Sequence, residues 1–316
     1  MVNEHPLLIL VGPTAVGKTA LSLQLAEELT GEIISGDSMQ VYRGMDIGTA
    51  KVSREERARI PHHLIDIRNP DEGFSVSEFQ RLATRVEEEI RHRGHLPLVV
   101  GGTGLYIRSL THGYRFAEVP GSEEFRRQMG KWLAENSPEA LHERLARIDP
   151  ESATTLHPND TRRVLRALEV FELSGVRWSE WQRRQEHRPQ KPFRMIGLAL
   201  ERERLYQRIN ERVMRMVKQG WVEEVEGLLS AGYSACLPSM QSLGYKEITS
   251  FLEGKQSLPE TIDRIQRNTR RFAKRQLTWF RRQHEVDWVY VDGLSARELL
   301  AKVKDCLAGN MTGRAE

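Results

Sequence analysis

Residues 7–19 read LLILVGPTAVGKT, and this stretch decides the fold class. The five apolar residues predict a buried strand, and a helical pattern runs from residue 18 to 29. Residues 12–19 fit GxxxxGK[ST] in the strand-loop-helix context that a phosphate-binding loop requires. The glycines let backbone amides turn toward phosphate oxygens, and the helix N-terminus adds positive potential. We therefore expect a pyrophosphate site formed by Gly12, Pro13, Thr14, Ala15, Val16, Gly17, Lys18 and Thr19.

Two residues of this loop have predicted roles of their own. Lys18 reaches terminal phosphate oxygens, and the Thr19 hydroxyl can bind Mg²⁺, the expected cofactor. The alternative is a turn that merely needs glycine, and the flanking strand and helix argue against it. The loop indicates a ligand with a pyrophosphate group and no more.

Strands and helices alternate through the first 115 residues. Strands are expected at 32–35, 63–67 and 96–100, and a helix that a Ser75–Glu78 capping box opens is expected to reach about residue 91. Gly101, Gly102 and Gly104 then lead into another helix. This alternation predicts an α/β fold, a P-loop NTPase-like parallel sheet with helices on both faces.

The alternation of strand and helix patterns stops at residues 116–192, and this segment is predicted to be an all-helical insertion domain. No β-branched run occurs there, and N-caps are expected at Ser137 and at Asn159 or Asp160. The core then resumes with strands at 193–200 and 288–291 and helices at 202–231, 259–284 and 296–307. The expected domains are a core in two parts, 1–115 and 193–316, and the insertion, 116–192.

Composition excludes some protein classes and leaves the partner open. Of the 316 residues 29% are charged, yet the formal charge is only +3, so partners must be inferred from local clusters. Cys236 and Cys306 form no metal-binding pattern, which favours a reduced, cytoplasmic protein without structural zinc. The apolar stretch 7–11 is too short for a signal or membrane segment. We expect a monomer.

An acidic residue follows the second predicted strand. Asp37 stands at the carboxyl edge of the predicted sheet, where α/β proteins bind ligands, although a solvated turn aspartate is the alternative. The strand 96–100 ends in glycines where an ATP hydrolase would carry a metal-binding aspartate, and Asp292 is interpreted as a turn residue. Most parts of an ATP hydrolase are therefore missing.

Residues 264–282, RIQRNTRRFAKRQLTWFRR, contain eight basic residues and no acid. Positions 264, 267, 271, 274 and 275 share one helix face, and Phe272, Trp279 and Phe280 are expected to anchor the helix to the core. A solvated helix normally mixes both signs, so the pattern favours a nucleic acid backbone as partner. The insertion adds Arg162, Arg163, Arg166, Arg183, Arg184 and Arg188, diluted by Glu169, Glu172, Glu180 and Glu186.

Over nearly its whole length the sequence resembles the bacterial tRNA dimethylallyltransferase (tRNA isopentenyltransferase) family. The resemblance rests on GPTAVGKT at 12–19, GDSMQVYRGMDIGTAK at 36–51, HHLIDI at 62–67, GGTGLY at 101–106, HPNDTRRVLRALEV at 157–170, QSLGYKE at 241–247 and RNTRRFAKRQLTWFR at 267–281. It implies a P-loop core with a channel that admits dimethylallyl pyrophosphate at one mouth and a flipped adenosine of the tRNA anticodon stem-loop at the other.

The resemblance also implies residue roles. Asp37 would be the general base, Arg212 would neutralise the leaving pyrophosphate, and Thr103 would complete the catalytic set. The implied product is N6-isopentenyladenosine next to the anticodon in tRNAs that read codons beginning with U. The implied tRNA contacts are Asp37, Ser38, Met39, Gln40, Thr103, Arg126, Thr161, Arg162, Arg163, Val164, Leu165, Gln241, Gly244 and Lys246, and the basic helix adds Arg271 and Lys274.

Two other functions are compatible with the phosphate loop. A small-molecule or nucleotide kinase would transfer phosphate from ATP and would give the basic helix no task. A non-enzymatic RNA-binding ATPase switch would leave Asp37 and the segment 101–106 without a chemical task. The motif histidines His62, His63 and His157 are interpreted as structural.

Overall fold

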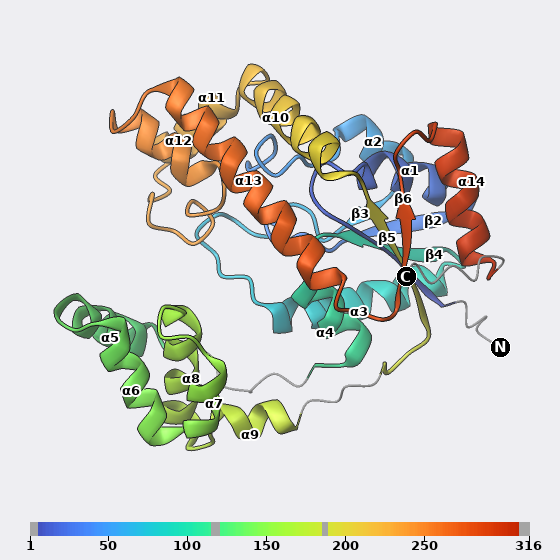
Figure 1. The fold of residues 1–316 in the computed structure, drawn as a ribbon. Helices are drawn as coiled ribbons and strands as arrows, with labels where there is room; N and C mark the ends of the chain where they lie inside the picture. Colours follow the sequence, from blue (N-terminus) through green and yellow to red (C-terminus); the bar gives the residue numbers. More distant parts are fainter. Residues whose placement is uncertain (1–5, 115–120, 185–188, 310–316) are drawn as a thin grey trace. The chain divides into compact units, whose positions relative to one another are not determined.

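The computed structural model describes residues 6–114, 121–184 and 189–309 (Figure 1). The chain divides into two compact units, a core of residues 1–111 with 190–316 and a second unit of residues 112–189. The boundary expected between residues 115 and 116 lies outside the described residues. Within the described ranges no helix is both long and apolar enough to cross a membrane.

The core contains one six-stranded sheet, and every pair of neighbouring strands is parallel. The strand order is β3-β2-β4-β1-β5-β6. The strands are β1 (Leu7–Val11), β2 (Gly31–Ser35), β3 (His62–His63), β4 (Leu96–Gly101), β5 (Phe193–Ala199) and β6 (Val286–Tyr290). The expected α/β fold with a parallel sheet is confirmed.

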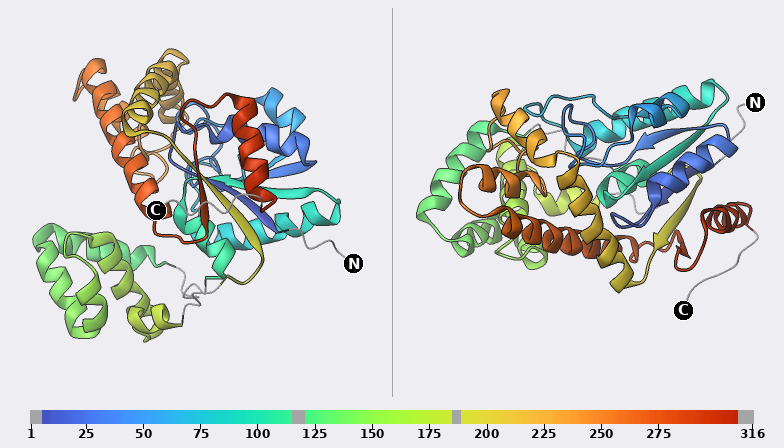
Figure 2. Two further views of the ribbon diagram at one scale, coloured as in Figure 1. Left: turned by 45° about the vertical axis from the view of Figure 1, so that its right-hand side comes forward. Right: turned by 90° about the horizontal axis from the view of Figure 1, so that it is seen from above.

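Helices cover both faces of the sheet. Along β1, Leu8 and Leu10 pack with α1 (Lys18–Glu28), α10 (Arg202–Lys218) and α14 (Ala296–Leu307). The alternate residues Leu7, Ile9 and Val11 pack with α3 (Val76–His92) and α4 (Gly104–His112). All five side chains are buried, as expected for a central strand that points side chains alternately to two covered faces. Figure 1 shows α3 and α4 on one side of the strands and α1 on the other, and Figure 2 gives two further views of this arrangement.

A third apolar cluster forms beside the sheet. Trp221 and Tyr245 are buried there with helices α11 (Trp221–Ser230) and α12 (Tyr245–Leu252), and Val41 and Met45 of the loop after β2 pack against them. The long helix α13 (Leu258–Phe280) contributes Ile265 to this cluster, while the short α2 (Arg54–Arg59) follows the loop. This cluster holds the loop that carries Asp37.

The expectation of a strand at 63–67 was wrong for most of its length. Strand β3 ends at His63, and Leu64 and Asp66 have positive φ angles of 62° and 57°. The Asp66 carboxylate accepts hydrogen bonds from Lys51 and Arg57 at 2.6 Å each. The segment therefore turns to bind the neighbouring loop instead of extending the sheet.

Four other expectations about the second part of the core are corrected. The helix expected at 202–231 is broken at Gly220, which has a φ of 98° and starts α11. Helix α13 ends at Phe280, not at residue 284, and β6 runs from Val286 to Tyr290 instead of 288–291. Phe272 is 36% exposed and lies beside Arg275, so it does not anchor α13; Phe280, 1% exposed, does.

The second unit is helical wherever it is described. It contains α5 (Glu123–Glu135), α6 (Pro138–Ile148), α7 (Pro150–Thr155), α8 (Thr161–Ser174) and α9 (Trp178–Arg183). Ser137 caps α6 with Pro138 in its first turn, and Asp160 caps α8, as expected. Leu141, Leu145 and Val164 form its own core, so the unit is built as a small helical bundle.

Candidate active site

The loop after β1 has the geometry of a phosphate cradle. Gly12 and Gly17 have φ angles of 146° and 112°, and Ala15 also lies in the left-handed region at 66°. The Val16 side chain is buried beneath the loop, whereas Thr19 is exposed in the first turn of α1. The Lys18 Nζ atom donates to the carbonyl oxygens of Gly12 and Pro13, both at 2.8 Å. The lysine therefore curls over its own loop.

Lys18 shares its surroundings with a second cation and an acid. Burial and the nearby Arg212 guanidinium lower the pKa of Lys18 to about 7, and the Asp37 carboxylate opposes that shift. Burial also lowers the pKa of Arg212, and again Asp37 acts in the opposite direction. These three side chains, from three separate segments, are close enough to interact electrostatically. We name Lys18, Asp37, Thr103 and Arg212 the phosphate-loop rim.

Asp37 is held by one carboxylate oxygen. Its Oδ1 atom accepts a hydrogen bond from the backbone N–H of Met39 at 2.8 Å, and its own N–H donates to Ser35 Oγ at 3.4 Å. Among the described residues, Oδ2 has no hydrogen-bond partner. An acid oriented through one oxygen, with the other available, is suited to accept a proton from a ligand.

The loops after β2 and β4 meet beside Asp37. A Cβ atom at Gly101 would lie 2.3 Å from the Gly36 carbonyl oxygen, so the approach of the two backbones requires glycine there. Thr103 N–H donates to Gly36 O at 3.4 Å, and Thr103 Oγ1 accepts from Ser38 N–H at 3.3 Å. The sequence-predicted residues Asp37, Ser38 and Thr103 therefore lie together. Gly101 and Gly102 lie at the end of β4, where an ATP hydrolase would carry a metal-binding aspartate.

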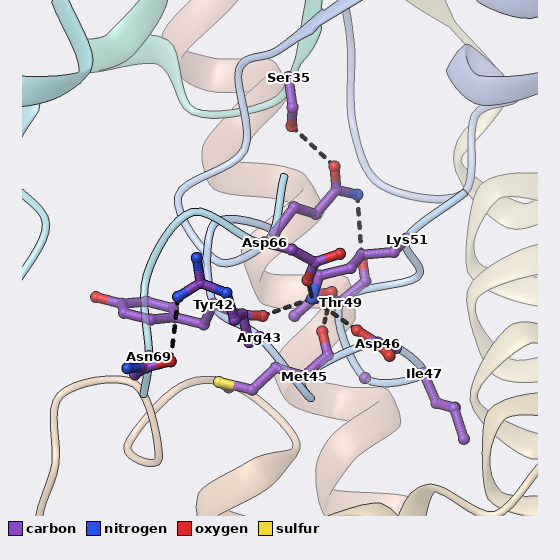
Figure 3. A network of polar contacts seen from close by, with 12 residues as sticks. Ser35, Tyr42, Arg43, Met45, Asp46, Ile47, Thr49, Lys51, Asp66 and Asn69 are labelled. Carbon is purple, nitrogen blue, oxygen red and sulfur yellow. Dashed lines mark hydrogen bonds and ion pairs between the residues drawn. The ribbon is translucent and has the colours of Figure 1, made fainter. Parts of the chain in front are cut away.

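Polar contacts fold the segment 38–51 into a defined loop (Figure 3). Lys51, whose side chain is 1% exposed, binds the carboxylates of Asp46 at 2.7 Å and Asp66 at 2.6 Å and the carbonyl of Tyr42. Gln40 accepts from Ser35 Oγ at 2.8 Å and donates to Thr49 O at 3.2 Å. Gln40, which was predicted to contact tRNA, therefore also stabilises this loop through hydrogen bonds. The role of Lys51 was not predicted.

Glu224 of α11 fastens the same loop from the other side. Its carboxylate accepts from the backbone N–H groups of Asp46, Ile47 and Gly48 at 2.8, 2.6 and 3.2 Å. It also accepts from the Tyr245 hydroxyl at 2.6 Å. Burial and the Glu224 carboxylate raise the pKa of Tyr245 far above its usual value, so this hydroxyl stays a donor. Sequence reasoning missed Glu224.

The exposed side of α13 carries the expected positive charge. We name Arg264, Arg267, Arg271, Lys274 and Arg275 the basic face; all five are exposed. The helix buries Thr261, Ile265, Ala273, Gln276 and Phe280 on its other side. Arg264 has one contact, to Gln256 Oε1 at 3.4 Å, and none of the five forms an ion pair within the described ranges. Uncompensated charge on one face favours a polyanionic partner.

The residues predicted to contact tRNA at 241–247 differ in exposure. Gln241 and Lys246 are exposed, and Lys246 lies 3.9 Å from the Glu247 carboxylate. Gly244 is buried, and a Cβ there would lie 2.0 Å from Trp221 Cζ2. Close packing against Trp221 therefore requires glycine at position 244.

The predicted tRNA contacts in the second unit also divide by burial. Arg162 and Arg163 are exposed at the start of α8, and Thr161 is half-buried. Val164 is 0% exposed and Leu165 packs against the same core, so the Val164 side chain is not available to a ligand.

A buried acid binds two arginines of this unit. Arg126 and Arg166 bind the Glu169 carboxylate at 2.9 and 2.6 Å. Glu169 was expected to reduce the positive charge of an exposed patch, but it is buried and orients these two arginines. Arg188 and Glu186 lie outside the described residues. His63, which binds Glu32 at 2.6 Å, and His157, which accepts from Asn159 N–H, make the structural contacts expected of them.

Comparison with known proteins identifies the family. The model of the family "IPP transferase" matches residues 40–283. The chain belongs to the IPP transferase family. The tRNA dimethylallyltransferase of Geobacillus thermodenitrificans is 52% identical over 282 residues, 89% of each chain, and that of Halalkalibacterium halodurans is 46% identical over 315 residues, 99% of this chain and 100% of the relative.

Solved structures of the IPP transferase family have the same fold. The full-length tRNA isopentenylpyrophosphate transferase of Bacillus halodurans superposes with a TM-score of 0.72 at 45% identity, over 96% of each chain. A eukaryotic dimethylallyltransferase described as acting on tRNA gives a TM-score of 0.80 at 29% identity, over 98% of this chain and 81% of that one. The resemblance inferred from the motifs is therefore confirmed.

Proposed function

We propose that this protein transfers the dimethylallyl group of dimethylallyl pyrophosphate to N6 of the adenosine 3′-adjacent to the anticodon, in tRNAs that read codons beginning with U. Relatives at 46–52% identity that are named tRNA dimethylallyltransferase support the reaction class. The observation that carries the proposal is the rim, where Lys18 and Arg212 lie near the acid Asp37. Cations suit a departing pyrophosphate, and the acid suits a proton lost by the attacking amine.

The electrophile supplies most of the reactivity. An adenine amino group is a weak nucleophile because its lone pair is delocalised into the ring. When the C–O bond of the allylic pyrophosphate breaks, the electron pair leaves with the pyrophosphate and positive charge spreads over the allyl group. The backbone N–H groups of residues 15–19, together with Lys18 and Arg212, stabilise the growing negative charge, which is commonly the largest catalytic contribution.

Asp37 completes the bond change. As the N6–carbon bond forms, N6 carries a proton that must leave, and the Asp37 carboxylate accepts it and later releases it to water. The Met39 amide holds one oxygen of this carboxylate in place, so the other can face the amine. A positioned base of this kind contributes roughly 10² to 10⁴ in rate.

Mg²⁺ fits this site as a companion of the pyrophosphate. Within the described residues no group of three or more His, Cys, Asp and Glu side chains could hold a metal, but Mg²⁺ commonly uses few protein ligands together with phosphate oxygens and water. The exposed Thr19 hydroxyl would be such a ligand. When bound, the ion would neutralise part of the pyrophosphate charge.

The tRNA substrate accounts for the basic face of α13. Its exposed charges form no ion pair with any residue that the structure describes, and they favour phosphate contacts with salt-sensitive affinity. The target amine is reached only when the base leaves its stack, so an enzyme of this kind must accept a flipped adenosine. A kinase would leave this face without a task.

One assay tests the function against both alternatives. The protein is incubated with labelled dimethylallyl pyrophosphate, Mg²⁺ and unmodified tRNA transcripts, and RNA nucleosides are analysed by mass spectrometry. We expect label on one adenosine beside the anticodon of tRNAs that read U-initial codons. Phosphate transfer from ATP would support the kinase, and RNA-stimulated ATP hydrolysis without labelling would support the switch.

A further inference from the structure

Gln276 joins two loops of the active site from the buried side of α13. Its Oε1 atom accepts a hydrogen bond from the Thr14 N–H of the phosphate loop at 2.9 Å. Its Nε2 atom donates to the Gly102 carbonyl oxygen at 3.1 Å. The residue is only 6% exposed, although its neighbours Lys274 and Arg275 belong to the basic face. The oxygen and the nitrogen of one side-chain amide therefore connect two distant segments. Thr14 lies 262 residues from Gln276 in the sequence, and Gly102 lies 174 residues from it.

Glycines make room for this connection. A Cβ atom at Gly102 would lie 2.1 Å from Gln276 Nε2, and one at Gly104 would lie 2.0 Å from Trp279 Cδ1. Residues 276 and 279 are three apart and share one side of the helix. Helix α13 is thus seated directly on the loop after β4, and any side chain at these glycines would push it away.

The connection continues to the proposed base. Thr103, next to Gly102, bonds to Gly36 and Ser38, the residues on either side of Asp37. Hydrogen bonds therefore connect the phosphate loop to Gln276, Gln276 to the loop after β4, and that loop to the segment that carries Asp37.

We propose that Gln276 is a positioning residue for the transfer reaction: it holds the phosphate loop in register with the loop of Asp37 and Thr103. The inference rests on the proposed function. Gln276 touches the backbone of both loops and acts through them. Reactions that depend on alignment are sensitive to small displacements, since a misplacement of about 1 Å can cost about 100-fold in rate.

Gln276→Met tests this role, because methionine has a similar length and cannot replace the hydrogen bonds. The matched control is Gln266→Met on the same helix, where the Gln266 amide donates to Asn210 O on α10 at 3.4 Å, away from both loops. We expect kcat of Gln276→Met to fall about 10- to 100-fold, with the Kd for tRNA unchanged within about twofold. The control should keep wild-type values. A wild-type kcat in Gln276→Met would overturn the inference.

A binding measurement keeps the test independent of turnover. Inorganic pyrophosphate, titrated by calorimetry without tRNA, should bind Gln276→Met about 2- to 10-fold more weakly than the control, because the phosphate loop loses the hydrogen bond from Thr14 N–H to Gln276 that fixes its backbone. Equal or tighter binding would overturn the inference whatever the transfer assay gives.

A variant that fails to fold and a wild-type protein without transfer activity each have a separate interpretation. If thermal unfolding shows that Gln276→Met does not fold, Gln276→Glu takes its place; it keeps an acceptor for Thr14 and loses the donor to Gly102, and a wild-type kcat there would overturn the inference. If the wild-type protein transfers no dimethylallyl group, the proposed function fails, and the pyrophosphate titration still decides the role of Gln276.

Discussion

The phosphate-loop rim and the basic face of α13 both gather positive charge, and they do so in opposite ways. At the rim, Lys18 and Arg212 lie in a partly buried setting that lowers both pKa values, with one acid nearby. On the basic face, five cations stand exposed on a single helix. Charge in a poorly solvated site acts strongly on bond changes, whereas exposed charge attracts a polyanion and is screened by salt.

This difference separates chemistry from docking. Substitutions of the charged rim residues Lys18, Asp37 and Arg212 should change kcat or donor binding and keep tRNA affinity within a few fold, and substitutions on the basic face should do the reverse. A variant that changed both equally would break the comparison.

The largest effect is expected for Asp37→Ala. Loss of the proton acceptor should lower kcat by about 10² to 10⁴, while the Kd for tRNA stays within a few fold. Single-turnover transfer and a separate tRNA-binding assay measure the two quantities. The control is Asp71→Ala, which removes an exposed acid outside the rim. Wild-type turnover in Asp37→Ala would remove it as the base.

Lys18→Met should weaken pyrophosphate binding by about 10- to 100-fold, because a hydrogen-bonding cation is lost. The wild-type pKa of about 7 adds a pH signature. Above pH 7 the free lysine is mostly neutral and must take up a proton when the anion binds, so affinity should fall as pH rises.

Calorimetry at pH 8 in buffers of different ionisation enthalpy measures that proton. We expect uptake approaching one proton for the wild-type protein and for a Lys302→Met control on α14, and little for Lys18→Met. Equal uptake in all three would show that Lys18 is not the titrating group.

Charge reversal on the basic face should act on docking alone. Arg271→Glu with Lys274→Glu should weaken tRNA binding about 10-fold or more and reduce the slope of log affinity against log salt by about 2, with kcat at saturating tRNA nearly unchanged. Arg297→Glu with Lys302→Glu on α14 changes the net charge equally and serves as control. An unchanged salt slope would count against this face.

The smallest effect concerns the support of the rim. Glu224→Gln should lower the free energy of unfolding by about 1.5–3 kcal/mol, because backbone amides of the loop 46–48 lose a charged acceptor. Glu223→Gln, one residue earlier and exposed, is the control and should lie within about 0.5 kcal/mol of wild type in urea unfolding. Equal stability of the two variants would contradict the role of Glu224.

Local patterns in the sequence predict much of the fold. Apolar runs that end in glycine identify β1, β2 and β4, and Asp37 is found because it follows such a run. The apolar run at 63–67 misleads because Leu64 is buried although its backbone is in the left-handed region and not in a strand. Gly220 favours a break between α10 and α11, but the apolar periodicity continues across it, so one helix was expected over 202–231.

The supporting residues of the site are not predictable in this way. Glu224 lies 178 residues from Asp46, and Gln276 lies 262 residues from Thr14, so no local pattern connects them. Both are polar residues on amphipathic helices, and sequence alone gives each the same appearance as a solvated side chain. Their roles arise from tertiary packing.

The most direct test of the account is the stoichiometry of the reaction. With labelled donor, Mg²⁺, unmodified tRNA and ATP present together, we predict one pyrophosphate released for each dimethylallyl group found on RNA, and no loss of ATP. Release of pyrophosphate without alkylated RNA, or consumption of ATP, would contradict the claim that this phosphate loop holds a leaving group while Asp37 takes the proton.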